Sequence, residues 1–282
     1  MKETLLISAL LLLLISSCKK NISSEDVHIE STGLLKKTGI YVPSLRSTFF
    51  TEYQYDNLSR VIKIIEYTKQ NSNDSIPVSE TSFYYNNNYR LPYKFYILGA
   101  NKWHFLTYDT QGRLSKDSIL YQINPTPVTG INYFTYSGNT RLGYYPSQIG
   151  GPTGGHWGGD MRDSLAIIND NYVHYRFYWD VTHPFDPPKY VDQFNMMFDN
   201  KKNPLYFLNT KPLFDLDKIH IVRSDLNYAK NNLIYRESYD APMNHSFITG
   251  NIKYSYTSDD YPIKRVHIKK LDTIDITEYS YY

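Results

Sequence analysis

The stretch Tyr53-Gln54-Tyr55-Asp56-Asn57-Leu58-Ser59-Arg60-Val61 contains the pattern that decides the fold. Two aromatic residues separated by one residue lie on the same face of a β-strand, because side chains alternate across a strand. The Asp, Asn and Ser that follow favour a turn, because they bond to nearby backbone or tolerate positive φ. The aliphatic Val61 then starts a strand that runs back. These nine residues therefore predict the tip of a β-hairpin.

The same pattern recurs along the chain every ~23–32 residues, which is about the length of one hairpin and its return connection. Seven or eight copies predict on the order of 14–16 antiparallel strands, at two strands per hairpin. Fuller copies run from Leu106 to Leu114 and from Tyr254 to Ile263, weaker copies start at Phe83, Phe134, Phe194 and Leu226, and a degenerate copy starts at Ile168.

Composition points to the same fold class. The chain has 29 tyrosines, a residue that favours strands and half-buried surfaces. The formal net charge is only +2, so the chain lacks the strong basic excess of a nucleic-acid-binding protein. We therefore predict an all-β protein that does not bind nucleic acid.

The strand patterns bear on how the sheet meets a membrane. In the stretch from Arg60 to Tyr67, strict alternation places Ile62 and Ile64 on one face and Val61 on the other. A membrane-spanning strand needs an apolar outward band, whereas both faces of residues 263–270 carry cations. We therefore predict a large antiparallel meander of hairpin repeats, either a curled sheet or a closed barrel, that is soluble and lipid-anchored.

The N-terminus has the order of charge, apolar residues and small residues that marks a secretory signal. Lys2 precedes an apolar stretch, and Ile15-Ser16-Ser17-Cys18 forms a lipobox around the only cysteine of the chain. An ordinary signal peptide with an incidental cysteine is the alternative. We predict a lipoprotein signal peptide at 1–17, lipidation at Cys18, a polar tether over 18–39 and a single antiparallel β domain over 40–282. The lysines after Cys18, in place of an inner-membrane retention aspartate, favour the outer membrane, on its periplasmic face or at the cell surface.

These tyrosine–aspartate units behind a lipobox resemble a family of Bacteroidota lipoproteins of unknown function with a porin-like β-fold. More loosely, the units are similar to the tyrosine–aspartate (YD) repeats of Rhs-type proteins. The resemblance covers roughly residues 48–282, most closely at Tyr53–Val61 and Tyr108–Leu114. It implies a large antiparallel sheet curled toward a barrel, and it implies no established activity and no catalytic residues.

Candidate sites are few. The glycine-rich stretch 150–160 interrupts the repeat, and its His156 and Trp157 are candidate ligand-binding residues, together with Trp103 and Trp179. A long connection with Trp157 packed back on the sheet is the alternative for this stretch. The eight histidines show no metal-ligand spacing, and no catalytic motif is present. The sequence therefore predicts no catalytic residue, no metal and no cofactor.

Three hypotheses for function remain open. The leading one is a non-catalytic cell-envelope protein that is held to the membrane by its lipid anchor and binds a glycan, a lipid or other apolar small molecule, or an envelope protein. The second is an envelope hydrolase whose catalytic groups converge from loops such as 150–160. The third is a structural module that presents its loops to partners.

Overall fold

In the computed structural model of the chain, the described residues are 33–70, 76–122, 128–146, 159–181, 189–206, 229–240, 245–269 and 272–282. Gly33–Tyr282 is a compact unit distinct from Met1–Thr32. Its elements, in chain order, are β1 (Leu35–Val42), the short 3-10 helix η2 (Pro43–Leu45), β2 (Ser47–Tyr55), β3 (Val61–Gln70), β4 (Ile76–Tyr85), β5 (Pro92–Ile97), β6 (Lys102–Tyr108), β7 (Leu114–Tyr121), β8 (Val128–Ser137), β9 (Thr140–Tyr145), β10 (Gly159–Ile168), β11 (Asn171–Val181), β12 (Lys189–Phe198), β13 (Leu233–Asp240), β14 (His245–Tyr256), β15 (Pro262–Lys269) and β16 (Asp272–Tyr281).

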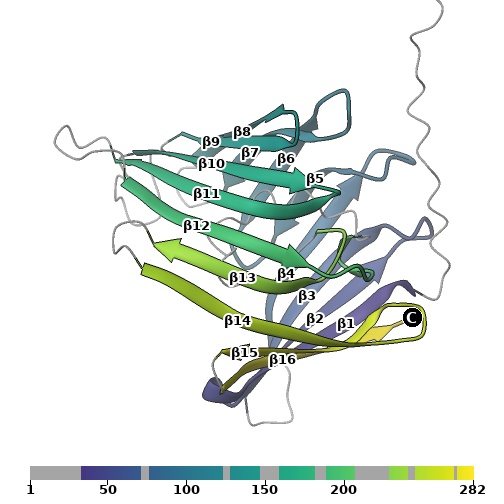
Figure 1. Cartoon of the computed structure of the whole chain (residues 1–282). Helices are drawn as coiled ribbons and strands as arrows, with labels where there is room; N and C mark the ends of the chain where they lie inside the picture. The colour runs from purple at the N-terminus through teal and green to yellow at the C-terminus, as the bar shows by residue number, and fades with distance from the viewer. Residues whose placement is uncertain are drawn as a thin grey trace, which may run out of the picture. The chain divides into compact units, whose positions relative to one another are not determined.

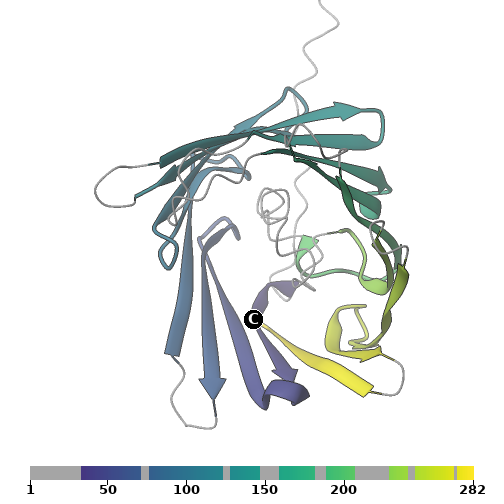
Figure 2. The same ribbon diagram turned by 90° about the vertical axis from the view of Figure 1, so that its left-hand side faces the viewer.

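These strands form one antiparallel meander in which each pairs with its neighbour in sequence (Figure 1). The ring closes because β1 also pairs with β16, with Thr38 opposite Tyr279 and Ile40 opposite Thr277 (Figure 2). The predicted all-β antiparallel fold is confirmed, and of the two expected forms the structure is the closed barrel. In the part of the chain that the structure describes, no helix is long and apolar enough to cross a membrane.

The repeat units all end at the same rim of the barrel, which we call the tyrosine rim. It is defined by the turns at 56–60, 86–91, 109–113, 137–139, 169–170 and 257–261 and by the start of the connection after β12. Consecutive hairpins of a meander turn at alternate ends, so units spaced by one full hairpin return to one rim. The hairpin tips predicted from the copies starting at Tyr53, Phe83, Leu106, Phe134, Ile168 and Tyr254 are confirmed. The copy starting at Phe194 is not a tight hairpin tip, because β12 ends at Phe198 and β13 begins only at Leu233. The copy starting at Leu226 begins outside the described residues.

A β-bulge follows several of the rim turns. Gln54 pairs with Lys63 but Tyr55 pairs with Val61, so Ile62 is an extra residue without a partner on β2. Val61 and Ile64 are therefore both buried, at 0% and 8% exposed, while Ile62 is 37% exposed. The expectation that Ile62 and Ile64 share a face is wrong, because a bulge shifts the alternation by one residue. Equivalent register shifts occur at Tyr85, Tyr108 and Tyr256.

The first strand begins earlier than the sequence indicates. β1 starts at Leu35, so residues 35–39, which we assigned to the polar tether, belong to the barrel. Leu35 and Thr38 are both buried, while Lys37 lies on the opposite face and pairs with Glu52 at 2.9 Å. This strand appears polar in sequence because its outward side is charged and its inward side includes a threonine.

The barrel interior contains an apolar cluster near the tyrosine rim. It consists of Leu35, Tyr53, Val61, Ile64, Phe83, Phe95, Leu106, Leu114, Phe134, Leu165, Tyr175, Phe194, Leu205 and Ala229. Side chains on the opposite face of the same strands point outward, and several are charged. Lys63 of β3, for example, pairs with Glu80 of β4 at 2.8 Å on the outward face.

The interior is also polar in places. In β16, Asp275 and Thr277 point inward and are 5% and 3% exposed, whereas Ile274 is 37% exposed. A buried carboxylate needs a partner, and Arg265 of β15 supplies one, with its Nη2 2.5 Å from Asp275 Oδ1. The polar side of a strand therefore does not always mark its outward face.

Candidate functional site

Tyrosines tie neighbouring strands together at the tyrosine rim. In five units, the tyrosine that ends an even-numbered strand donates its hydroxyl to the backbone carbonyl at the start of the preceding strand. The pairs are Tyr55 to Leu35, Tyr85 to Val61, Tyr108 to Pro92 and Tyr281 to Pro262, each at 2.7 Å, and Tyr136 to Leu114 at 3.0 Å. Burial raises the pKa of Tyr55, Tyr85 and Tyr281 above the ordinary value, so these hydroxyls stay protonated donors.

The aspartates of the repeat build the turns. Oδ1 of Asp109 accepts the backbone N–H groups of Gln111 and Arg113, at 2.9 Å each, and its Oδ2 accepts the Arg113 guanidinium. Burial alone would raise the pKa of the Asp109 carboxyl, but the hydrogen bonds from Arg113 and Gln111 outweigh it, and this pKa lies below its ordinary value. Asp56 makes the same bonds with Leu58 and Arg60. The prediction that these aspartates are turn formers is confirmed.

Each of these arginines also packs on the tyrosine of the next unit. The Arg60 guanidinium carbon lies 4.5 Å from the ring centre of Tyr85, and that of Arg113 lies 4.1 Å from the ring centre of Tyr136. Cation–π contacts of this kind are worth about 0.5–1 kcal/mol at partly exposed sites. The turns are therefore fixed both within one hairpin and to the next.

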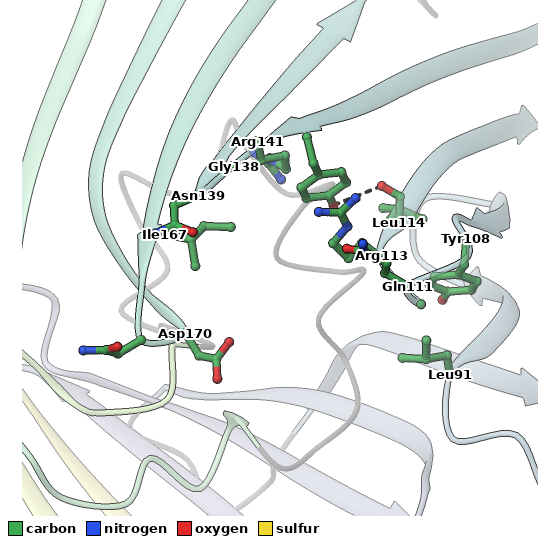
Figure 3. Close-up of a pocket in the computed structure, with 13 residues that line it drawn as sticks. Leu91, Tyr108, Gln111, Arg113, Leu114, Gly138, Asn139, Arg141, Ile167 and Asp170 are labelled. Atoms are coloured by element: carbon green, nitrogen blue, oxygen red, sulfur yellow. Dashed lines mark hydrogen bonds between the residues drawn. The ribbon is translucent and has the colours of Figure 1, made fainter. Parts of the chain in front are cut away.

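Between four of these turns the rim encloses a pocket of about 500 Å³. That volume lies within the range of small-molecule sites. Figure 3 shows Tyr108, Gln111 and Arg113 along one side and Asn139, Arg141 and Ile167 along another, with Asp170 below. The complete lining is Leu91, Tyr108, Gln111, Gly112, Arg113, Leu114, Tyr136, Gly138, Asn139, Arg141, Ile167, Asn169 and Asp170.

The two arginines that line the pocket have carboxylate partners. Arg141 is 1% exposed, and its Nη2 donates to Oδ2 of Asp163 at 3.0 Å. Nη2 of Arg113 lies 2.7 Å from Oδ2 of Asp109. Burial raises the pKa of the Asp163 carboxyl, which Arg141 opposes. With each guanidinium neutralised, the pocket offers aromatic rings and hydrogen-bonding groups rather than a strong net charge.

Asp170 is the carboxylate among the described lining residues. It accepts the Tyr206 hydroxyl at 3.1 Å, and burial together with the Asp170 charge raises the pKa of Tyr206 to about 12. The side-chain amides of Gln111, Asn139 and Asn169 can each donate and accept hydrogen bonds. Asn139 and Asn169 lie in rim turns, and Asn169 has positive φ. This mixture suits a neutral ligand with many hydroxyl groups.

The candidate residues from sequence lie elsewhere or are not described. Trp103 is on β6 beside His104, which is buried in the interior, so Trp103 faces outward, where it contacts Tyr84 and Tyr96. It does not line the pocket. His156 and Trp157 lie outside the described residues. Trp179 pairs in β11 opposite Met161 and Lys189, and its side chain is not described.

Sequence reasoning missed the buried charged groups of the interior. Nδ1 of His104 lies 3.0 Å from Asp117, and Asn132 donates to the same carboxylate at 3.1 Å. Burial lowers the pKa of His104 although Asp117 opposes it, so the imidazole is neutral and Nδ1 carries the hydrogen that Asp117 accepts. An aspartate in the middle of a strand is unfavourable unless it is paired, and Asp117 and Asp163 were therefore the signal in the sequence. Among the described residues no three His, Cys, Asp or Glu side chains are grouped to hold a metal ion.

Comparison with known proteins supports the fold. No protein-family model and no curated protein matches the chain. Among solved structures, a porin-like protein from Bacteroides vulgatus aligns with 89% of this chain and 99% of its own, with 8% identity and a TM-score of 0.50. A porin-like protein from Bacteroides uniformis aligns with 88% and 97%, with 12% identity and a TM-score of 0.49. The closed antiparallel barrel and its alignment with the Bacteroides vulgatus protein confirm, at the level of fold, the porin-like β-fold that the sequence resemblance implies.

Proposed function

We propose that this barrel is a cell-envelope lipoprotein that binds a short neutral glycan in the pocket of the tyrosine rim. The observation that carries the proposal is the pocket lining, in which Tyr108 and Tyr136 stand beside three amide side chains and two neutralised guanidiniums. Sugars present apolar C–H faces and many hydroxyls, and a site that pairs rings with hydrogen-bonding groups satisfies both. An apolar ligand would cover the amide groups of the lining without giving them hydrogen-bond partners, which costs free energy.

The described lining favours binding over hydrolysis. Glycoside hydrolysis ordinarily uses a pair of carboxyl groups that flank the scissile bond. Of the described lining residues, Asp170 alone carries a carboxyl group, and it is hydrogen-bonded to Tyr206. Asp109 and Asp163 lie behind the lining, each bound to an arginine. The hydrolase hypothesis would need groups from residues 150–158, which lie outside the described part of the chain.

A panel of soluble oligosaccharides tests the pocket. Titration calorimetry should find saturable binding that is weakened at least ~10-fold by Gln111→Ala with Asn139→Ala, since each good hydrogen bond contributes about 1 kcal/mol. Both side chains are exposed at the rim, so the fold should survive. The matched control is Asn57→Ala with Asn88→Ala, at rim turns outside the pocket. Equal weakening by the two pairs, or no saturable ligand in the panel, would reject the pocket as a glycan site.

The outward charges support a barrel in water. Lys37 with Glu52 and Lys63 with Glu80 form outward ion pairs along β1–β4. A lysine facing lipid at the bilayer midplane costs about 2–4 kcal/mol. A lipid anchor at Cys18 would instead hold the barrel at the outer membrane from outside the bilayer. Intact-mass measurement of detergent-extracted protein should show a chain that starts at Cys18 and carries acyl groups, and an unmodified or differently cleaved N-terminus would contradict the anchor.

A further inference from the structure

The outward side of β5–β9 carries a concentration of aromatic side chains. These strands lie side by side in the sheet (Figure 1). Aromatic rings gather on their outward face, and we call this set the aromatic flank; it consists of Tyr84 from the adjoining β4, Tyr96, Trp103, Phe105, Tyr133 and Tyr144. Tyr84, Phe105 and Tyr133 are 38%, 41% and 42% exposed. Tyr84, Tyr96, Trp103 and Phe105 are in contact as one group, and Tyr133 with Tyr144 forms a second group on the far side of β7. Exposed rings gathered on one face are typical of an interaction surface.

The flank is positively charged. β5–β9 contain a single acidic residue, Asp117, which points inward and is fully buried. Lys94 and Lys116 stand on the outward side, and neither forms an ion pair within the described part of the chain. Lys94 instead lies over the rings of Tyr84 at 4.9 Å and Trp103 at 4.8 Å. On β1–β4, by contrast, the outward Lys37 and Lys63 are each paired with a glutamate. The flank therefore complements a negatively charged partner.

The surroundings of Trp103 favour an anionic lipid surface over an acidic polysaccharide as the partner. Trp103 lies 4.7 Å from Tyr96 at an interplanar angle of 35° and 6.2 Å from Phe105 at 23°. The Lys94 ammonium also lies over the Trp103 ring, 4.8 Å from its centre. These neighbours crowd the faces of Trp103 on which a sugar would otherwise stack. Exposed rings beside lysine ammonium groups instead match a lipid headgroup region, where Trp, Tyr and Lys are enriched.

We propose that the aromatic flank docks on the surface of an anionic lipid bilayer. The rings would enter the headgroup region, while Lys94 and Lys116 would contact lipid phosphates. Because the flank runs along the side of the barrel, docking would lay the barrel against the membrane. The proposal does not depend on the rim pocket, which lies on the inner side of the turns.

Vesicle co-sedimentation tests the proposal with the chain from residue 19 to 282, which lacks the acyl anchor of Cys18 and keeps the whole compact unit. Phosphatidylcholine vesicles with about 30 mol% phosphatidylglycerol should bind at least ~10-fold more tightly than phosphatidylcholine alone. Trp103→Thr with Phe105→Thr should weaken this binding more than ~10-fold. Lys94→Gln with Lys116→Gln should weaken it up to ~30-fold, at about 5-fold per lysine, and added salt should do the same.

Matched controls change the same residue types on other outward surfaces. Tyr41→Thr with Met197→Thr removes two exposed apolar side chains, and Lys253→Gln with Lys264→Gln removes two exposed lysines. Both should leave vesicle binding within about 2-fold, and circular dichroism should show that every variant keeps its strands. Equal effects from flank and control pairs, equal binding to both vesicle types, or flank-dependent binding to an acidic polysaccharide but not to vesicles would overturn the proposal.

Discussion

Removing one hydroxyl from the tyrosine rim should measurably destabilise the barrel. The Tyr85 hydroxyl donates to the carbonyl of Val61 at 2.7 Å, and Val61 is fully buried. Tyr85→Phe keeps the ring and removes only this hydrogen bond. A typical intramolecular hydrogen bond contributes about 0.5–1.5 kcal/mol, and a buried acceptor left without its partner costs about 1–3 kcal/mol. We therefore expect Tyr85→Phe to lower the free energy of unfolding by about 1–2 kcal/mol.

The effect should accumulate around the rim. Tyr55, Tyr85, Tyr108 and Tyr136 occupy equivalent places on hairpins that are two strands apart. Two strand spacings are about 10 Å, a separation at which mutational effects are roughly additive. Changing all four to Phe should cost about 4–8 kcal/mol, which is comparable with the whole stability of a typical domain at 5–15 kcal/mol. The quadruple variant should therefore unfold at far lower denaturant or fail to fold.

Equilibrium urea unfolding followed by tryptophan fluorescence measures these changes. Tyr41→Phe and Tyr133→Phe are the matched controls, because both residues are outward and about two-fifths exposed. Each control should stay within about 0.5 kcal/mol of the parent, as is usual for surface substitutions. If Tyr85→Phe were no more destabilising than Tyr133→Phe, the hydroxyl-to-carbonyl ties would not stabilise the rim and the reasoning would be refuted.

Three further outcomes follow from single residues. Asp109→Asn should lower the free energy of unfolding at pH 7. Because the pKa of Asp109 is depressed in the folded state, unfolding titrations should show the difference between variant and parent shrinking as pH falls below about 4. A difference that does not depend on pH would contradict this. The pKa of His104 is lowered in the folded state, so as pH falls the unfolded state takes up the His104 proton first, and the parent should lose stability below about pH 6.5. His104→Asn should reduce this dependence of unfolding free energy on pH. An unchanged pH dependence would show that another group is responsible. Gly250→Ala should destabilise strongly, because φ is +122° and the new Cβ would lie 2.3 Å from the Ile268 carbonyl oxygen, whereas Gly138→Asn, in open space at φ +54°, should melt within a few degrees of the parent.

The fold could be predicted from sequence because the repeat marks one end of every second strand. The turn is fixed by hydrogen bonds from Arg60 to Asp56, which lie four residues apart. A pattern this local can be recognised without knowing which strands pair with it. The register could not be predicted in the same way. The extra residue at Ile62 inverts the faces of the strand that follows, and nothing in Val61-Ile62-Lys63 distinguishes a bulge from simple alternation.

The pocket was not predictable for a related reason. Gln111, Asn139 and Asn169 come from three different turns, and only the closure and curvature of the sheet bring these turns around one cavity. Trp103 drew attention because tryptophan is rare, but its face of the strand depends on the bulged register of β5–β7. Asp117 and Asp163 were better indicators, since a carboxylate within a strand needs a buried cation or imidazole nearby.

The pairing of β1 with β16 has a consequence for biosynthesis. The ring is closed by the first and last strands of the barrel, and the Tyr282 backbone N–H donates to the carbonyl of Leu34 where they meet. The hairpins can form one after another along the chain, but the outer edge of β1 stays unpaired until β16 has formed. A chain truncated before β16 should therefore be prone to aggregation and depend on chaperones, although it contains the other fifteen strands.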